Sequence, residues 1–288
     1  MGRERILIAG GGIAGLTLGA ALSRVGLDAE LVERDTEWRT VGAGIAVQPN
    51  GVRVLRQLGL GPALEKAGAS IHRWLFRDQD GAVLCDIELS AVWGDVGDFI
   101  GIDRARLQEM LRSKADVSCR LGTWVTSLSQ TEYGVSVEFS NGTRGEYGLV
   151  VGADGIRSTV RQAVLGTTSP VYGGQMAWRS LAPIRPTGVE GVEFWLGDGC
   201  FFGLCPVGDG RTYGFGNVTQ PQIHDPLPEG SSVCVNASRR SAGQFVNTWR
   251  RWNRTSRFTA DRSSGWRWSA GMSVASSSSA TRHTRALR

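Results

Sequence analysis

The hydrophobic pattern at the start of the chain predicts a strand, a glycine turn, a helix and a second strand. Ile6–Ala9 is an apolar run of strand length, and an alanine- and leucine-rich stretch follows the glycines at 10–12 and 15. A second apolar run at 29–32 comes directly before the acid Glu33. Short apolar strands that alternate with helices are typical of βαβ units and a parallel sheet. We therefore predict an α/β fold that begins with such a unit.

The sequence after residue 34 predicts further helices and strands. Apolar positions at helical spacing indicate the helices, alternating apolar positions indicate the strands, and turn residues separate them. The expected elements are a helix over Val52–Leu58, a hairpin over 71–89 that turns at Asp80-Gly81, a helix over Arg104–Lys114 capped by Asp103, three or four strands over 117–151 with a turn at Asn141-Gly142, a helix from about Ser158, and further strands after Thr168.

The glycine turn is the strongest indication of function. Gly10-x-Gly12-x-x-Gly15 joins a strand to a helix whose first N–H groups are free, and this arrangement holds a pyrophosphate. Gly10 provides the tight turn, Gly12 lets the backbone approach the phosphates, and Gly15 lets the helix pack on the strand. Glu33 is placed to accept ribose hydroxyls. The predicted ligand is an adenine dinucleotide, and the alternative is a glycine turn with a structural role only.

The same stretch has a competing interpretation as a secretory signal, because Ile6–Leu22 is apolar and follows Arg3 and Arg5. A signal peptide has an uninterrupted apolar region before its cleavage site. The glycine cluster and the strand pattern from Asp28 to Arg34 argue against a signal. We expect the fold to start at the first residues, without a presequence.

A second motif follows another apolar strand. Leu149–Val151 runs into Gly152-Ala153-Asp154-Gly155, and the next helix is expected to begin near Ser158. Ligands of α/β folds bind beyond the carboxyl ends of the strands, where such turns expose free amides. The position of the Asp154-Gly155 turn after an apolar strand, with the spacing of Ser158 and Arg161, therefore indicates a second ligand-binding segment.

Composition and charge narrow the class of protein. The 288 residues are 41% hydrophobic, enough for one large or two modest domains, and they contain no glycine-free apolar run of membrane-spanning length. The five cysteines form no CxxC pair, which favours reduced thiols in a cytoplasmic protein. The net charge of +5 comes from residues 239–288, which hold eleven arginines and one aspartate. The rest of the chain is acidic, so we predict no nucleic-acid partner for it.

The two motifs together resemble those of the class A flavoprotein aromatic hydroxylases, the p-hydroxybenzoate and salicylate hydroxylase type. The resemblance rests on Gly10-x-Gly12-x-x-Gly15 with Glu33, on Gly152-Ala153-Asp154-Gly155-x-Arg157-Ser158-x-Val160-Arg161, and on the segments Gly42–Ile45, Pro49-Asn50, Leu58–Leu60, Asp103–Leu111, Gly203–Pro206, Asp209-Gly210 and Tyr213. It implies an α/β fold with a Rossmann-like FAD-binding domain of the glutathione-reductase type and a partial, β-rich substrate domain.

The resemblance also implies a reaction. Reduced nicotinamide, NADH or NADPH, passes a hydride to FAD, dioxygen reacts with the reduced flavin, and one oxygen atom is transferred to an electron-rich aromatic ring. The protein holds the reactants in place and keeps water out. The chain has no second complete glycine motif, which agrees with a nicotinamide cofactor that docks transiently.

Site residues follow from the resemblance, position by position. The residues implied to bind FAD are Gly10, Gly12, Ile13, Ala14, Gly15, Glu33, Arg34, Arg104, Asp154, Gly155 and Arg161, of which Asp154 and Arg161 also help to dock NAD(P)H. Trp178, Arg179 and Tyr213 are candidate substrate contacts. The alternatives are a turn-capping role for Asp154, a solvated Arg104, and a core role for the aromatic side chains. No catalytic residue, metal site or oligomeric state is predicted.

Domain boundaries are expected at about residues 165 and 228. Residues 1–165 are predicted to form the FAD-binding domain, with a β-hairpin insertion at about 71–99, and residues 166–228 a partial substrate-binding sheet. Residues 229–288 are predicted to be non-native or disordered. Residues 239–288 contain only five Leu, Ile, Val or Phe residues beside four tryptophans, which is too few aliphatic side chains for a packed core.

This tail leads to a hypothesis about the reading frame. The family's third flavin motif, Gly-Asp-Ala-Ala-His after an apolar strand, is missing from the chain. In a frame shifted by one base, each new codon consists of the last base of the preceding codon and the first two bases of its own. In that frame Ser276–Ser279 are read as aliphatic or Phe codons, and Ala280–Thr284 can encode the missing motif. A one-base slip between about Pro226 and Arg239 explains this, and loss of the motif predicts weak or absent FAD retention and poor stability. The alternative is an arginine- and serine-rich, disordered tail that binds nucleic acid or acidic surfaces.

Three classes of function stay open at this point. The first is an FAD-dependent monooxygenase, impaired in this product. The second is another FAD-dependent enzyme, a dehydrogenase, reductase or halogenase with the same glycine motif, and the third is a non-catalytic remnant. Asp154-Gly155 with Arg161 favours the first class over the second.

Overall fold

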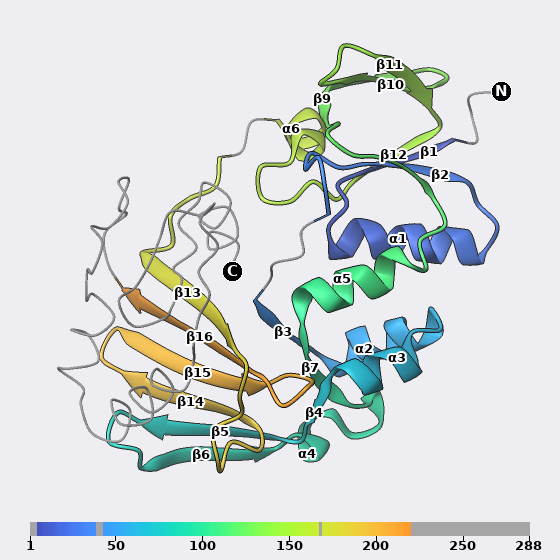
Figure 1. The fold of residues 1–288 in the computed structure, drawn as a ribbon. Coiled ribbons are helices and arrows are strands. Elements are labelled where there is room, and N and C mark those ends of the chain that lie inside the picture. Colours follow the sequence, from blue (N-terminus) through green and yellow to red (C-terminus); the bar gives the residue numbers. More distant parts are fainter. Residues whose placement is uncertain (1–4, 39–42, 167–168, 220–288) are drawn as a thin grey trace. The chain divides into compact units, whose positions relative to one another are not determined.

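The computed structural model describes residues 5–38, 43–166 and 169–219. It divides into two compact units, one made of the described parts of Met1–Val41 and Ala105–Val171, the other of Gly42–Arg104 and the chain from Tyr172. Each unit combines helices and sheets (Figure 1). This grouping differs from the expected division at about residue 165, because the 42–104 segment adds two strands to the largest sheet of the second unit. The hypothetical break between Pro226 and Arg239 lies outside the described residues.

The first unit is built on a parallel sheet with the strand order β12-β1-β2-β8. The four strands are β1 (Ile6–Ala9), β2 (Ala29–Val32), β8 (Ser118–Arg120) and β12 (Leu149–Gly152). Helix α1 (Ile13–Arg24) connects β1 to β2, so the predicted βαβ unit is confirmed. Leu7 and Ile8 are both fully buried, because both faces of β1 are covered.

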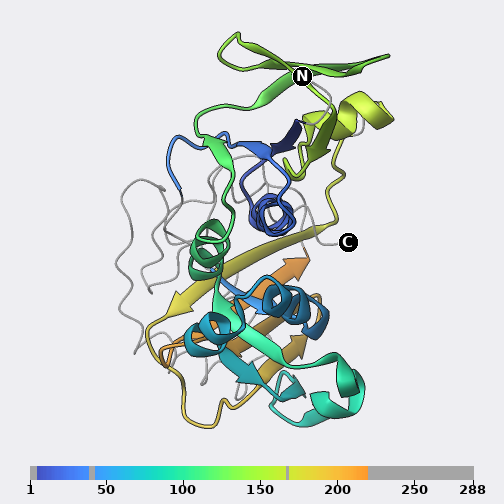
Figure 2. The ribbon, with the colours of Figure 1, turned by 90° about the vertical axis from the view of Figure 1, so that its right-hand side faces the viewer.

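An antiparallel sheet of order β11-β10-β9 lies on one face of the parallel sheet, and α1 lies on the other (Figures 1 and 2). Its strands are β9 (Val125–Thr131), β10 (Gly134–Phe139) and β11 (Arg144–Tyr147). The core between the two sheets contains Leu7, Ala9, Val32, Val125, Val137, Phe139, Tyr147 and Val160. The predicted turn at Asn141-Gly142 is confirmed: Asn141 Oδ1 accepts the Thr143 N–H at 3.1 Å, and Gly142 has a φ of 79°.

Two helices of this region begin where the sequence predicts. Helix α5 (Arg104–Arg112) begins directly after Asp103. Helix α6 (Thr159–Leu165) follows Ser158, whose Oγ accepts the Arg161 N–H at 2.9 Å and so caps the helix. The 117–151 segment contains five strands rather than three or four, because β8 and β12 join the parallel sheet while β9 to β11 pair with one another.

The second unit contains a six-stranded sheet of order β13-β16-β15-β14-β5-β6. Its strands are β5 (Arg73–Asp78), β6 (Val83–Glu88), β13 (Gln175–Ala182), β14 (Val192–Gly197), β15 (Cys200–Pro206) and β16 (Thr212–Thr219). β5 and β6 form the predicted hairpin, and β5 pairs in parallel with β14. The hairpin therefore extends this sheet.

A smaller sheet and short helices complete the second unit. The sheet has the order β3-β7-β4, with β3 (Gly44–Val47), β4 (Ala69–Ile71) and β7 (Phe99–Asp103). The helices are α2 (Pro49–Gln57), α3 (Gly61–Ala67), α4 (Leu89–Trp93) and the 3-10 helix η1 (Gly94–Val96). The helix predicted over Val52–Leu58 is confirmed and begins earlier, at Pro49, whose missing N–H is tolerated in the first turn.

Aromatic side chains form much of the core of the second unit. The Trp74 ring lies edge-on to Phe99 with centroids 5.4 Å apart, and Phe194 lies edge-on to Phe215 at 5.6 Å. Tyr213 is stacked on Phe215 at 5.0 Å. Edge-to-face and offset pairs of this kind add to the stability that burial provides.

A polar network links the two sheets of the first unit. Glu30 on β2 accepts hydrogen bonds at Oε2 from Arg5 Nη2 at 2.7 Å and from the Tyr147 hydroxyl at 2.8 Å. Arg120 Nε lies 2.5 Å from Glu30 Oε1. Burial, with the nearby Glu30 carboxylate, raises the pKa of Tyr147 to about 12. Glu30 therefore connects β2 to β11 through charged and neutral donors.

We predict that Glu30→Gln lowers the free energy of unfolding by about 2 kcal/mol, because it removes the charge that pairs with two arginines in a largely buried position. Urea denaturation measures the change. Glu138→Gln is the matched control, since Glu138 pairs with Arg144 on an exposed part of the same unit and its loss has a smaller effect. Equal losses in the two variants would contradict this role for Glu30.

We also predict a loss of stability at alkaline pH that depends on Tyr147. A pKa raised from about 10 to about 12 favours the neutral phenol in the folded state. The stabilisation is therefore complete below about pH 10 and is lost as the pH rises through about 12. Urea denaturation across this range, compared with Tyr147→Phe, measures it. The prediction would be contradicted if the difference in the free energy of unfolding between wild type and Tyr147→Phe stayed constant across this pH range.

Candidate functional site

The two predicted motifs lie next to each other at the carboxyl ends of β1 and β12. The two strands are paired in parallel, and the Ala153 N–H continues the ladder to Ala9 O at 2.8 Å. The chain leaves β1 through α1 toward β2, on the side away from β12. The strand order therefore reverses between β1 and β12, and open α/β sheets bind ligands at such a reversal.

The three motif glycines have different surroundings. Gly10 has a φ of 111°, and a Cβ there would collide with Ala153 O. A Cβ on Gly15 would collide with Gly10 O. Outside its chain neighbours and its own helix, a Cβ on Gly12 would meet no described atom within 4 Å. Gly10 and Gly15 are thus required by close packing, whereas Gly12 faces open space.

The start of α1 faces this open space. Gly12 is the N-cap residue, has no side chain to cap the helix, and accepts the Leu16 N–H at 3.0 Å. The amides of Ile13 and Ala14 have no carbonyl one turn earlier to accept them. The positive end of the helix dipole adds to their attraction for an anion. The position suits a diphosphate.

Glu33 is held against the glycine turn. Its Oε2 accepts the Gly11 N–H at 2.7 Å, and its Oε1 accepts the Asp35 N–H at 2.9 Å. An ionised carboxylate has about four acceptor positions, so both oxygens keep capacity for ribose hydroxyls. The adjacent Arg34 is exposed, and its guanidinium lies 5.5 Å from the centre of the Trp124 ring.

Asp154 caps α6 with one of its oxygens. Its Oδ2 accepts the Thr159 N–H at 2.7 Å and the Val160 N–H at 3.3 Å. Arg161 folds back and donates to Gly155 O at 3.3 Å and to Ile156 O at 2.5 Å. Asp154 Oδ1 is buried and has no hydrogen-bond partner among the described residues. The capping role is therefore present, and a buried acceptor is left for a bound molecule.

Two residues of this site were not found by the sequence analysis. Gln108 on α5 donates from Nε2 to Gly11 O at 3.0 Å. The Trp38 ring lies against Gly11, where a Cβ would be 2.8 Å from Trp38 Cζ3. The Arg112 guanidinium carbon lies over the same ring, 5.5 Å from its centre. The helical spacing of Gln108 and Arg112 places them on one face of α5. No local signal links that face to the glycine turn.

The other candidates belong to the second unit. The Arg104 N–H donates to Ala43 O at 3.0 Å. Arg179 Nη1 donates to the Tyr213 hydroxyl at 3.2 Å. Tyr213 is buried, which raises its pKa, while Arg179 acts in the opposite direction. Trp178 lies on β13, and its side chain is outside the described part of the structure. Arg179 and Tyr213 are thus brought together, with Tyr213 also part of the aromatic core.

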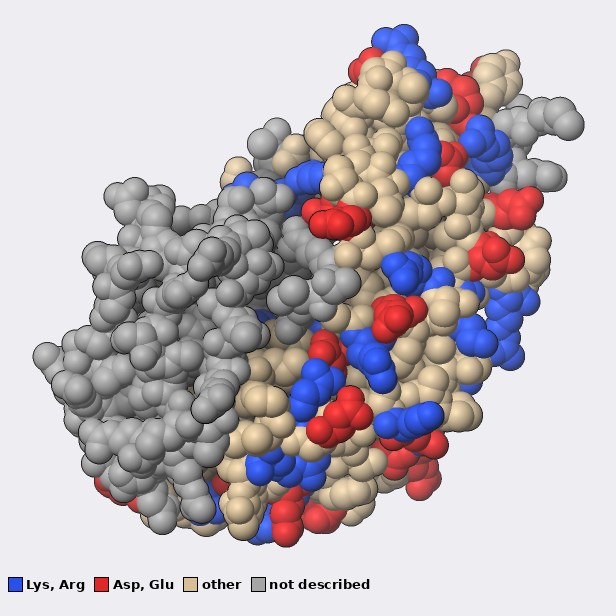
Figure 3. All heavy atoms as spheres, in the orientation of Figure 1, with Lys and Arg blue, Asp and Glu red and all other residues tan. Residues whose placement is uncertain are grey.

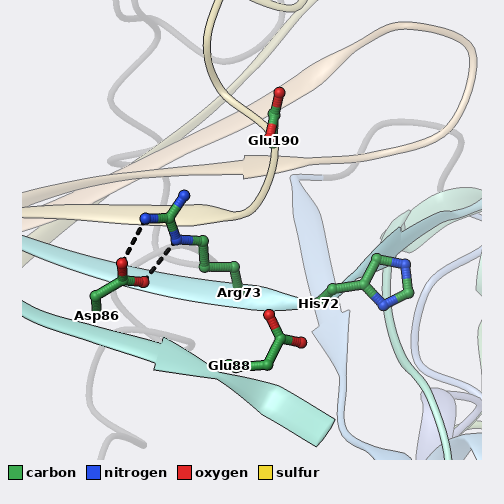
Figure 4. Close-up of a pocket in the computed structure, with 5 residues that line it drawn as sticks. All are labelled: His72, Arg73, Asp86, Glu88 and Glu190. Atoms are coloured by element: carbon green, nitrogen blue, oxygen red, sulfur yellow. Dashed lines mark hydrogen bonds and ion pairs between the residues drawn. The ribbon is translucent and has the colours of Figure 1, made fainter.

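A cavity of about 510 Å³ in the second unit is lined by His72, Arg73, Asp86, Glu88 and Glu190 (Figure 4). Arg73 Nε donates to Asp86 Oδ1 at 2.6 Å. This bond raises the pKa of Arg73 and lowers that of Asp86, so both stay charged and neutralise each other. The lining has no nucleophile and none of the predicted site residues, and we assign it no reaction.

Charged side chains of both signs are interspersed on the face of the molecule shown in Figure 3.

Among the described helices, none combines the length and the apolar character needed to cross a membrane. In the described ranges, no group of three or more His, Cys, Asp or Glu side chains is arranged to hold a metal ion.

Comparison with known families decides which dinucleotide this arrangement suits. A family model described as FAD binding domain matches residues 3–247. The chain belongs to the FAD-binding domain family. The cofactor expected from the sequence, FAD, is the one that this family binds, and the open space at Gly12 with Glu33 beside it fits such a ligand. Residues 248–288 lie outside the match.

Several relatives of this chain are named as enzymes. This chain is 37% identical over 225 residues to the aurachin C monooxygenase/isomerase of Stigmatella aurantiaca, and the match covers 75% of this chain and 57% of the relative. It is 32% identical over 251 residues to the FAD-dependent urate hydroxylase of Klebsiella pneumoniae, covering 85% of this chain and 64% of the relative. The chain thus spans less than two thirds of the length of these relatives.

A solved structure supports the same fold. Klebsiella pneumoniae HpxO, crystallised with FAD and uric acid, matches with a TM-score of 0.70 and 30% identity, covering 83% of this chain and 62% of HpxO. The predicted α/β, Rossmann-like fold with a β-rich second part is confirmed.

We predict that Gly12→Ala and Gly15→Ala separate binding from folding. Gly12→Ala keeps the melting temperature within a few degrees of wild type, because no described atom occupies the space, but it weakens FAD binding at least about ten-fold by filling the approach to the diphosphate. Gly15→Ala lowers the free energy of unfolding by about 3 kcal/mol or more, through overlap with Gly10 O. Thermal melts and FAD titrations test both. A Gly12→Ala variant that binds FAD normally would contradict the assignment.

Proposed function

We propose that this chain is the FAD-holding part of a monooxygenase that hydroxylates an aromatic small molecule, with NAD(P)H and O2 as co-substrates. The observation that carries the proposal is the strand reversal between β1 and β12, where Gly12 faces open space and Glu33 is held beside it. The names of the relatives, a urate hydroxylase and an aurachin C monooxygenase/isomerase, support the reaction class.

In this proposal each motif residue of the first unit has a role toward FAD. Gly10 and Gly15 allow the close packing of the turn, and the amides of Gly12, Ile13 and Ala14 bind the diphosphate. The roles of the remaining residues of this unit are as follows: Glu33 accepts the ribose hydroxyls, Arg34 contacts the nucleotide, Asp154 Oδ1 and Gly155 contact FAD, and Arg161 holds the Gly155 turn and helps to dock NAD(P)H. Arg104 belongs to the second unit, and its contact with the nucleotide stays a prediction from the resemblance.

FAD, when bound, supplies the redox chemistry: it takes a hydride from NAD(P)H and activates dioxygen. The second unit is proposed to hold the aromatic substrate, with Trp178, Arg179 and Tyr213 as contacts. Arg179 presents charged donors beside the Tyr213 hydroxyl, and this pair suits a ring oxygen of a phenol or a related heterocycle. The aromatic side chains around Tyr213 exclude water from that side.

We also place the protein in the cytoplasm. The four cysteines of the described part of the chain, Cys85, Cys119, Cys200 and Cys205, are all free thiols. Reduced cysteines are typical of that compartment.

We predict that the purified chain binds FAD on titration but loses it during gel filtration, because the third flavin motif that the resemblance implies, Gly-Asp-Ala-Ala-His, does not occur in the sequence. Quenching of flavin fluorescence measures binding, and the visible spectrum of the eluted protein measures retention. Glu33→Gln weakens binding further, since the neutral amide is a poorer acceptor for ribose hydroxyls and for the Gly11 N–H.

The reaction is tested in the same preparation. With FAD added, NAD(P)H oxidation that increases with a phenolic substrate and yields a hydroxylated ring supports the monooxygenase. Absence of any FAD-dependent signal, at concentrations where the protein is folded, would contradict FAD binding. A cofactor that stays bound through gel filtration would contradict the predicted weak retention alone.

A further inference from the structure

The peptide groups on both sides of Gly11 are held by side chains from distant segments. The Gly11 N–H donates to Glu33 Oε2 at 2.7 Å, and the Gly11 carbonyl accepts from Gln108 Nε2 at 3.0 Å. Glu33 follows β2, and Gln108 lies on α5. The first bond fixes the plane of the Gly10–Gly11 peptide, and the second fixes the plane of the Gly11–Gly12 peptide, because a peptide group is planar.

The second of these planes contains the N–H of Gly12. In a trans peptide the carbonyl of one residue and the N–H of the next point in opposite directions. A donor that holds the Gly11 carbonyl therefore also aims the Gly12 amide away from Gln108. Gly11 and Gly12 have no side chains to resist rotation of this peptide, and glycine accepts nearly every backbone conformation. The orientation depends on Gln108.

The Trp38 ring packs against Gly11 on the side where a Cβ would lie. The ring lies so close that a Cβ on Gly11 would be 2.8 Å from Cζ3 and 2.9 Å from Cη2. Arg112, one helical turn after Gln108, lies over the same ring at 5.5 Å. Both α5 side chains thus reach the glycine turn, one directly and one through Trp38.

We propose that Gln108 is a positioning residue for the dinucleotide site, which aims the Gly12 amide at the diphosphate by holding the Gly11 carbonyl. The inference rests on the proposed function, because it names the amide that meets the diphosphate. Gln108 does not touch the ligand in this arrangement. Its contribution is that the loop has its binding shape before FAD arrives, so binding does not have to order it.

The test uses the full chain with Gln108→Met, which keeps the size of the side chain and removes the donor. FAD affinity, measured by flavin fluorescence quenching, falls about ten-fold. Hydrogen–deuterium exchange of peptides that cover 10–16 becomes faster in the protein without FAD, because the Gly11–Gly12 peptide is released. The control is Gln162→Met on α6, whose side chain is exposed and which leaves both measurements unchanged.

Gln108→Glu provides a pH readout that a merely structural role would not give. The ionised carboxyl cannot donate to the Gly11 carbonyl, whereas the protonated carboxyl can. FAD affinity of this variant therefore improves, relative to Gln108→Met, as the pH falls through the range in which glutamate is protonated. A constant ratio of the two affinities across that range would overturn the proposal.

Failure of this inference is distinguishable from failure of the proposed function. A wild-type chain that binds FAD, with Gln108→Met equal to it in affinity and in exchange, overturns the role of Gln108 and leaves the proposed function intact. A folded wild-type chain that binds no FAD overturns the proposed function. In that case, unchanged hydrogen–deuterium exchange of peptides covering 10–16 in Gln108→Met overturns the inference as well. Faster exchange supports the role of Gln108 in holding the Gly11 carbonyl.

Discussion

The first unit depends on the approach of backbone to backbone at Gly10. The Gly10 Cα lies so near Ala153 O, and the Gly15 Cα so near Gly10 O, that a side chain at either glycine would force β1 away from β12 or α1 away from β1. The parallel pairing of β1 with β12 and the seating of α1 both require this contact. Because the two motifs belong to these same elements, their adjacency is a consequence of packing before any ligand is considered.

The acids of the site are first of all parts of their own loops. Glu33 accepts two backbone N–H groups, and Asp154 Oδ2 caps the start of α6. Each carboxylate is thereby fixed in direction. Asp154 Oδ1 has no hydrogen-bond partner among the described residues, and each Glu33 oxygen can accept a further hydrogen bond beside the one it makes. A capping role and a ligand-binding role are therefore compatible at Asp154. The two interpretations that the sequence left open describe different oxygens of one side chain.

Local features of the fold were predictable, and distant pairings were not. The β1–α1–β2 unit, the cap at Ser158 and the turn at Asn141-Gly142 each depend on residues a few positions apart, which a pattern can show. The parallel pairing of β5 with β14 joins segments more than a hundred residues apart, and it moves the 42–104 segment into the second unit. The bond from Gln108 to Gly11 is of the same distant kind. A long polar side chain on a helix is equally typical of a solvated face.

Glycines in two motifs that look alike in the sequence have different reasons to be there. In the Gly42-Ala43-Gly44 segment, a Cβ on Gly44 would collide with Cβ of Tyr213, so this glycine lets β3 lie against β16. At Gly12 the same added atom would meet only open space. A glycine that packing requires is explained without a ligand, whereas a glycine with free space above a helix start is explained by what approaches it. By this criterion packing explains Gly44, whereas at Gly12 packing gives no reason for a glycine and the proposed approach of a dinucleotide does.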